Sequence, residues 1–138
     1  MQNPQRSHAQ AKLLIADDSA EMRSLLRRMC AHAFAEILEC ADGEQAVALF
    51  NDQRPDCVLM DIAMPRQDGL AAMARILARK PAARVIIVSQ HDSAPFRQAA
   101  AKAGACGFVS KNDLASLCGL LIDLGAGHLL DSSSPQKP

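Results

Sequence analysis

Short apolar runs alternate with amphipathic segments through the middle of the chain, and this alternation limits the folds that the chain can adopt. The apolar runs have the length of strands and lie at 13–15, 36–40, 57–60, 85–88 and 107–109. Four of them lack polar alternation, which is typical of parallel strands covered on both faces. The run at 36–40 contains Glu36 and Glu39, so we expect it at an edge of the sheet.

Segments of helical periodicity lie between and after the apolar runs. The residues expected to begin these helices are Ser19, Asp42, Asp68, Asp92 or Ser93, and Asp113. In the fourth helix we expect an inward stripe of Phe96, Ala99, Ala100 and Ala103, and in the last one of Leu114, Leu117, Cys118 and Leu121. Five strand–helix units joined by right-handed crossovers predict a doubly wound α/β fold, (βα)5, around a parallel five-stranded sheet.

Composition narrows the class of protein further. A length of 138 residues fits one domain, and 49% hydrophobic residues are enough for a core. Fifteen basic residues balance fifteen acidic ones, and the aromatic residues are four Phe, which argues against a nucleic-acid-binding surface. No apolar run approaches the roughly 18 residues that span a bilayer, and 1–10 does not resemble a signal peptide. We expect no contact with a membrane.

The five cysteines are far apart and form no CxxC motif. Most of them lie in apolar segments. We therefore expect buried free thiols in a reducing compartment, which places the protein in the cytoplasm.

Residues whose side chains can bind a metal or take part in a reaction follow four of the predicted strands. Asp17 and Asp18 follow the first, Asp61 the third, Ser89 ends the fourth, and Lys111 follows the fifth. Because ligands of doubly wound sheets bind beyond the carboxyl ends of the strands, we expect these residues to meet at one edge. Each has an ordinary alternative by itself, as a helix cap, a loop residue or a solvated lysine. Their joint placement favours a site.

The chemistry of such a site follows from its charges. Clustered carboxylates repel one another unless a cation neutralises them, and Mg²⁺ prefers a few carboxylates together with waters. A carboxylate beside Mg²⁺ can attack phosphorus and form an acyl phosphate. Lys111 can then pair with the phosphoryl group, and the Ser89 hydroxyl can donate a hydrogen bond to it.

The stretches LLIADDS, VLMDIAMPRQDGL, VIIVSQHD and AGACGFVSK make the chain resemble the receiver domain of two-component response regulators over residues 11–126. The most specific feature is Asp61, followed by Met-Pro and then Asp-Gly. The resemblance implies a flavodoxin-like sandwich with strand order 2-1-3-4-5. It also implies that Asp61 accepts a phosphoryl group from a sensor histidine kinase or a phosphotransfer protein, and that the domain does not act as an enzyme on other substrates.

The resemblance further implies roles for the neighbouring residues. Asp18, Asp61 and the Ala63 carbonyl would bind Mg²⁺ directly, and Asp17 would act through water. Ser89 would be the switch hydroxyl and Lys111 the active-site lysine. Phe108 would take the place of the switch aromatic, which couples phosphorylation to the face formed by the fourth helix, the fifth strand and the last helix.

Three positions depart from the family pattern. Gln90 stands where a small residue is usual; its side chain either covers the site or points to solvent. Ala63 and His91 occupy the positions that tune the lifetime of the acyl phosphate, and since Ala63 has no side chain to position water, we expect slow dephosphorylation. Asn112 replaces a frequent Pro after Lys111, and we expect Asn112-Asp113 to cap the last helix.

We interpret 1–10 as a disordered tail and 127–138 as a C-terminal tail or a linker remnant. The sequence resembles those of receivers that precede a LuxR-type DNA-binding domain. No output domain is recognisable, and both a single-domain regulator and a fragment of a longer one fit. We expect no nucleic acid to bind to this domain itself.

Apolar residues on the outer side of the last helix suggest a homodimer or a partner surface, unless the tail folds back over them. These residues are Leu120, Ile122, Leu124, Leu129 and Leu130.

Two other functions compete with phosphoacceptance. A degenerate receiver would bind a partner protein independently of phosphorylation, and the complete set of strand-end residues argues against it. A phosphatase of the haloacid dehalogenase type needs DxDxT after its first strand, and a flavodoxin needs a phosphate loop there. The chain has Asp17-Asp18-Ser19 at this place and matches neither.

Overall fold

The computed structural model describes residues 11–122 and confirms the doubly wound α/β fold. All strand pairs are parallel, and the sheet order is β2-β1-β3-β4-β5, as the family resemblance implied. The strands are β1 (Lys12–Ala16), β2 (Glu36–Cys40), β3 (Cys57–Met60), β4 (Val85–Ser89) and β5 (Gly107–Ser110). The helices are α1 (Ala20–Cys30), α2 (Gly43–Gln53), α3 (Gly69–Arg79), α4 (Ala94–Lys102) and α5 (Ala115–Leu121).

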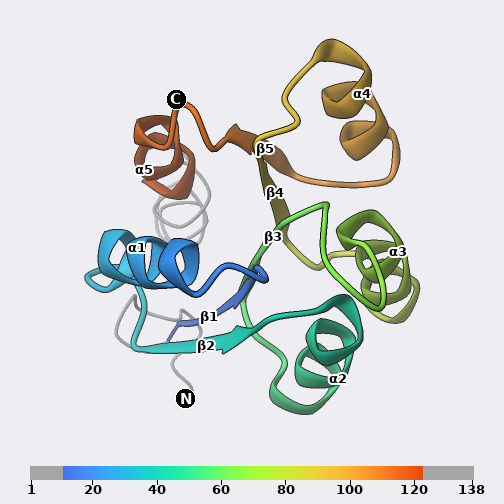
Figure 1. Cartoon of the computed structure of the whole chain (residues 1–138). Helices are drawn as coiled ribbons and strands as arrows, with labels where there is room; N and C mark the ends of the chain where they lie inside the picture. The colour runs from blue at the N-terminus through green and yellow to red at the C-terminus, as the bar shows by residue number, and fades with distance from the viewer. Residues whose placement is uncertain (1–10, 123–138) are drawn as a thin grey trace, which may run out of the picture.

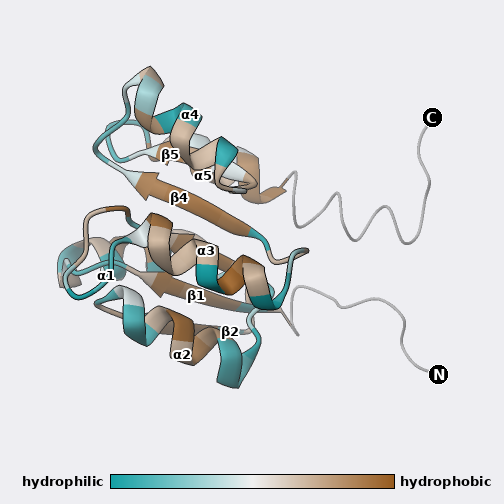
Figure 2. Cartoon of the chain, turned by 90° about the vertical axis from the view of Figure 1, so that its right-hand side faces the viewer, coloured by the Kyte–Doolittle hydropathy of each residue, from teal (hydrophilic) through white to brown (hydrophobic). Residues whose placement is uncertain are grey.

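The helices form two layers on opposite faces of the sheet. Figure 1 shows α1 and α5 on one face and α2, α3 and α4 on the other. Each face has its own core, because alternate residues of one strand point to opposite sides. Leu14 and Ala16 of β1 pack on the α2 and α3 side, and Leu13 and Ile15 pack on the α1 side. The central strands are accordingly hydrophobic throughout, whereas the helices carry polar residues on their outer sides (Figure 2).

Side-chain caps explain where three helices begin. The Ser19 hydroxyl accepts a hydrogen bond from the Met22 N–H at 3.1 Å and starts α1. Asp42 and Asp68 cap α2 and α3 in the same way, each with a hydrogen bond of 2.8 Å. These caps satisfy amide groups that have no partner within the helix.

The predictions for the last two helices were partly wrong. Ser93 does precede α4, but of the predicted inward stripe only Ala100 is buried, and Phe96 is 39% exposed. The physical reason is position: α4 lies beside β5, an edge strand, and reaches little of the sheet (Figure 1). The cap predicted at Asn112-Asp113 is wrong, because α5 begins at Ala115 after Leu114, without a side-chain cap.

The outer face of α5 also differs from the expectation. Leu120 packs against the core on the α1 side and touches the space beside Gly107, so it is not a free surface residue. Ile122 is 62% exposed, as expected. The predicted inward residue Cys118 is exposed. Leu124, Leu129 and Leu130 lie outside the described residues, as do the two predicted tails.

All five cysteines are free thiols. Cys30, Cys40 and Cys57 are buried, whereas Cys106 and Cys118 are exposed, so the prediction of burial holds for three of them. Burial raises the pKa of Cys30 to about 12 and that of Cys40 to about 11, which leaves both thiols protonated at neutral pH. Within residues 11–122, no helix is long and apolar enough to cross a membrane.

Candidate functional site

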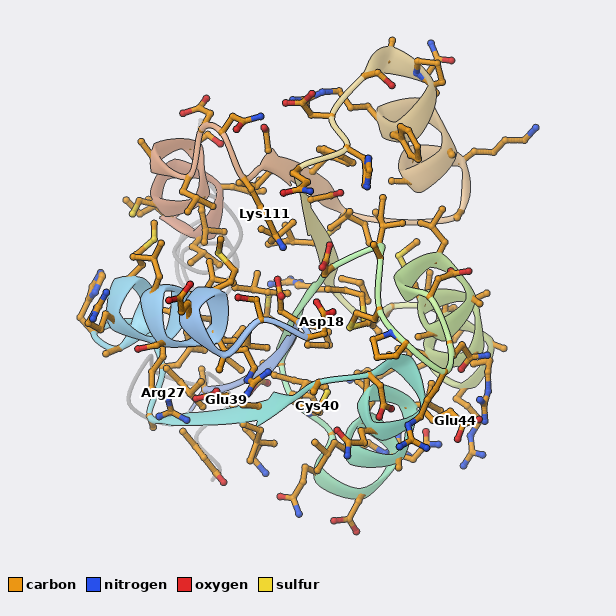
Figure 3. All side chains as sticks on the ribbon, in the orientation of Figure 1. Asp18, Arg27, Glu39, Cys40, Glu44 and Lys111 are labelled. Atoms are coloured by element: carbon orange, nitrogen blue, oxygen red, sulfur yellow. The ribbon has the colours of Figure 1, made fainter. Side chains whose placement is uncertain are left out.

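Asp17 follows β1 directly and is held by its backbone as well as by its side chain. It is 1% exposed. Its N–H donates to the Cys40 carbonyl at 3.1 Å, which continues the pairing of β1 with β2. Its Oδ1 accepts from the Ser19 N–H at 2.9 Å, and its carbonyl oxygen accepts from Arg23 Nη1 at 2.7 Å. Asp18, the next residue, is exposed at the carboxyl edge of the sheet (Figure 3).

Asp61 follows β3 and lies beside this loop. It is 5% exposed, and its N–H donates to the Ala16 carbonyl at 2.9 Å. Burial raises the pKa of Asp61, and the negative charge of Asp17 raises it further, while Lys111 and the Ala63 N–H oppose the shift. The raised pKa expresses mainly the cost of burying the Asp61 carboxylate, and the nearby charge of Asp17 adds to that cost.

Lys111 links the two carboxylates. Its Nζ lies 2.8 Å from Asp17 Oδ2 and 3.3 Å from Asp61 Oδ2, and its side chain is 13% exposed. Burial alone would lower the pKa of Lys111, but the close contact with the Asp17 carboxylate and the charge of Asp61 outweigh it and raise the pKa. Lys111 therefore stays charged beside the carboxylates. Figure 3 shows the Lys111 side chain extending toward Asp18.

The donor set fits a hard divalent cation. Carboxylate oxygens of Asp17, Asp18 and Asp61 lie within 4.8 Å of one another. Asp17 Oδ2 is buried and forms an ion pair with Lys111, but it receives no hydrogen bond of good geometry. A buried carboxylate oxygen without an aligned donor is costly, and a cation or its bound water can satisfy it. Oxygen donors of this kind match the preference of Mg²⁺.

The loop after β3 approaches Asp61 closely because residue 69 is a glycine. The Gly69 N–H donates to the Ile62 carbonyl at 2.7 Å. A Cβ atom at this position would overlap the carbonyl oxygen of Asp61. The Asp-Gly pair in the sequence marks this position, but its purpose, the close return of the chain over Asp61, requires the structure.

Ser89 ends β4 at the same edge of the sheet. It is fully buried, and its Oγ accepts a hydrogen bond from the His91 N–H at 3.0 Å. The Ser89 carbonyl accepts from the Lys111 N–H at 2.9 Å, which aligns the ends of β4 and β5. Gln90, His91 and Ala63 are exposed. The exposure of Gln90 favours the alternative in which its side chain points to solvent.

Phe108 lies on β5, next to α4. Its side chain is half-buried against the core on the α3 and α4 side. The Arg97 guanidinium lies over the ring, 4.7 Å from its centroid. Arg97 Nε also donates to the Asp92 carbonyl at 2.9 Å, so Phe108 is connected to the loop that follows Ser89.

Comparisons with known proteins identify the family of the chain. The family model described as the response regulator receiver domain matches residues 13–121. The chemotaxis protein CheY of Listeria monocytogenes is 38% identical over 101 residues, which cover 72% of this chain and 85% of that protein.

Two solved structures are similar over most of the chain. A LuxR-family response regulator from Aurantimonas has a TM-score of 0.79 and 32% identity, covering 87% of this chain and 88% of its own. The CheX–CheY–BeF₃–Mg²⁺ complex from Borrelia burgdorferi gives a TM-score of 0.75 and 29% identity, covering 83% of this chain and 88% of its own. The chain therefore belongs to the response regulator receiver domains of two-component signal transduction.

Proposed function

We propose that this receiver domain accepts a phosphoryl group on Asp61. The observation that carries the proposal is the position of Lys111 Nζ, 2.8 Å from Asp17 and 3.3 Å from Asp61, beside a cluster of three carboxylates. A nucleophilic carboxylate, a fixed cation and a set of oxygen ligands for a metal are the groups that phosphoryl transfer requires. All of them lie at the carboxyl edge of the sheet.

The transfer moves phosphorus from nitrogen to oxygen. A carboxylate oxygen of Asp61 attacks the phosphorus of a phosphohistidine on a sensor kinase or a phosphotransfer protein. The new O–P bond forms as the N–P bond breaks, and the imidazole leaves and takes a proton from solvent. The Lys111 ammonium pairs with the oxygens of the phosphoryl group as this group moves toward Asp61. The whole exchange occurs in the cytoplasm.

Asp18, Asp61 and the Ala63 carbonyl are the residues that we assign to Mg²⁺, with Asp17 acting through a bound water. The ion supplies charge neutralisation for the carboxylates and the phosphoryl oxygens. The similar CheY of Borrelia burgdorferi forms a complex with Mg²⁺ and BeF₃, which supports the same chemistry here. The buried Asp17 Oδ2 without an aligned donor supports it independently.

Ser89 and Phe108 read out the phosphorylated state in this proposal. The Ser89 hydroxyl accepts from the His91 N–H, so its own proton is available to donate to a phosphoryl oxygen. Movement of Ser89 toward the phosphoryl group and rotation of Phe108 change the surface of α4, β5 and α5, which controls a partner protein or dimerisation. This is a shift between two populations of one fold.

Beryllofluoride binding tests the site without a kinase. We expect Mg²⁺-dependent binding of beryllofluoride to the wild-type protein, observed as shifts of the amide signals of β4, β5 and α4. Asp61→Ala abolishes these shifts. Asp113→Asn, which changes an exposed carboxyl group outside the cluster, leaves them unchanged. Wild-type protein that does not respond would contradict phosphoacceptance and favour a phosphorylation-independent binding module.

A further inference from the structure

Arg23 connects the acidic loop, which joins β1 to α1 and contains Asp17 and Asp18, to the edge of the sheet. Its Nη1 donates to the Asp17 carbonyl at 2.7 Å, and its Nε donates to Glu39 Oε1 at 3.0 Å. Arg23 lies on α1 and Glu39 on β2. The Arg23 side chain is 20% exposed, so both contacts are partly shielded from water. One guanidinium thus fixes the loop relative to the strand.

Glu39 is anchored in turn by a second arginine. Its Oε2 accepts from Arg27 Nε at 2.6 Å, and Arg27 Nη2 donates to the Ile37 carbonyl at 2.9 Å. Figure 3 shows Arg27 and Glu39 side by side along β2. Arg27 therefore shares the carboxylate of Glu39 with Arg23, but its second hydrogen bond goes to β2 rather than to the acidic loop. This difference makes Arg27 a natural control.

The Asp17 carbonyl is a sensitive point for the proposed metal site. It belongs to the peptide unit that joins Asp17 to Asp18, and a peptide unit is planar, so fixing this oxygen restricts the direction of the next residue. Asp17 and Asp18 supply two of the three clustered carboxylates. An arginine this near a cation site would also repel the cation, and the negative charge of Glu39 offsets that repulsion.

We propose that Arg23, anchored by Glu39, is a positioning residue for the Mg²⁺ site, acting through the peptide unit between Asp17 and Asp18. The inference rests on the proposed function, since it assigns a supporting residue to the same site. Replacing a residue that orients a metal ligand without touching the metal commonly changes metal affinity by about 10- to 100-fold. Here the contact is to the backbone, so we expect a value near the lower limit.

The test measures Mg²⁺ affinity directly. The chain has no Trp or Tyr, so amide chemical shifts of a ¹⁵N-labelled full chain report the titration with Mg²⁺ alone. We expect Arg23→Gln to weaken Mg²⁺ binding about tenfold. Arg23→Lys keeps the charge but cannot reproduce the two-pronged contact with Glu39 and Asp17, and it weakens binding to a similar extent.

Arg27→Gln is the matched control. It removes a guanidinium group from the same helix, and this group also contacts the Glu39 carboxylate. We expect the Mg²⁺ affinity to change less than about twofold, well below the range for residues that orient metal ligands. Thermal unfolding of each variant shows whether the losses of stability are comparable. An equal loss of affinity in Arg27→Gln, or full affinity in Arg23→Gln, would overturn the inference and leave the proposed function intact. Wild-type protein that fails to bind Mg²⁺ would overturn both.

Discussion

Asp17 shows how a single residue can be fixed by the fold and still offer an oxygen to a ligand. Its N–H, carbonyl and Oδ1 all have hydrogen-bond partners, whereas Oδ2 has only the ion pair with Lys111. Binding a ligand at Oδ2 therefore requires no loss of an existing hydrogen bond. Preorganisation of this kind lowers the cost of binding.

Gly69, the first residue of α3, is predicted to tolerate no side chain. Gly69→Ala places a Cβ against the Asp61 carbonyl, and we expect it to lower the free energy of unfolding by about 2 kcal/mol, because the backbone has to move. Gly119→Ala is the control: nothing lies within 4 Å of its Cβ position, and Ala favours a helix by up to about 1 kcal/mol. Urea denaturation measures both, and a neutral Gly69→Ala would contradict the account.

Ala63 is predicted to set a long lifetime for the phosphorylated state. Its exposed methyl group cannot orient an attacking water, so the acyl phosphate is expected to hydrolyse slowly. Ala63→Asn places an amide two residues after Asp61 and is expected to speed hydrolysis. Loss of label from isolated phosphoprotein, followed over time, gives both rates. A wild-type half-life of seconds would show that other groups control hydrolysis.

At the scale of elements, the contact between α1 and β2 is an ion-pair cluster around Glu39. The hydrogen bond from Arg27 is the main cause that lowers the pKa of Glu39, burial opposes it, and the hydrogen bond from Arg23 lowers it further. β2 is an edge strand, and the cluster lies on its α1 side, since both arginines belong to α1. A charged residue in an edge strand also discourages pairing with other chains.

This cluster is predicted to make stability depend on pH. The pKa of Glu39 is lower in the folded protein than in the unfolded chain, so its contribution is complete above the unfolded value and is lost as the pH falls through the folded value. Glu39→Gln is expected to cost about 1 kcal/mol at neutral pH and much less under acid conditions. Urea midpoints across a pH series measure the difference, and a constant difference would refute the prediction.

The elements also show what sequence patterns can predict. The strands, their order and three helix caps followed from apolar runs, the family resemblance and capping residues. The inward face of α4 could not be predicted in this way. Phe96 and Ala99 have the right spacing, but their helix lies at the edge of the sheet. Periodicity identifies an apolar face but not how much sheet there is to cover. The Arg23–Glu39 contact was also missed, since no local pattern pairs residues 16 positions apart.

At the scale of the whole molecule, the predicted site residues divide into two groups. Asp17, Asp61 and Lys111 meet in direct contact, with Asp18 at the same edge. Phe108 lies near α4 and is connected to the Ser89 loop through Arg97 and Asp92. The parallel sheet explains both placements, because all strands end at one edge while their flanking helices form the outer surfaces.

Dimerisation through the last helix is a prediction about the whole molecule. Ile122 is 62% exposed, and burying it in a symmetric contact would remove apolar surface from water. We expect the wild-type protein to self-associate when Mg²⁺ and beryllofluoride are added, and Ile122→Ser to weaken this association. Sedimentation velocity detects both states. A monomer with and without beryllofluoride would rule out the dimer.

Transfer of a phosphoryl group to Asp61 is the direct test of phosphoacceptance by this domain. The protein is incubated with Mg²⁺ and a small phosphodonor, phosphoramidate, and the modified peptide is located by mass spectrometry. We expect a single phosphoryl adduct on the peptide that contains Asp61, absent without Mg²⁺ and absent in Asp61→Asn. An adduct that persists in Asp61→Asn, or wild-type protein that remains unmodified, would contradict this expectation.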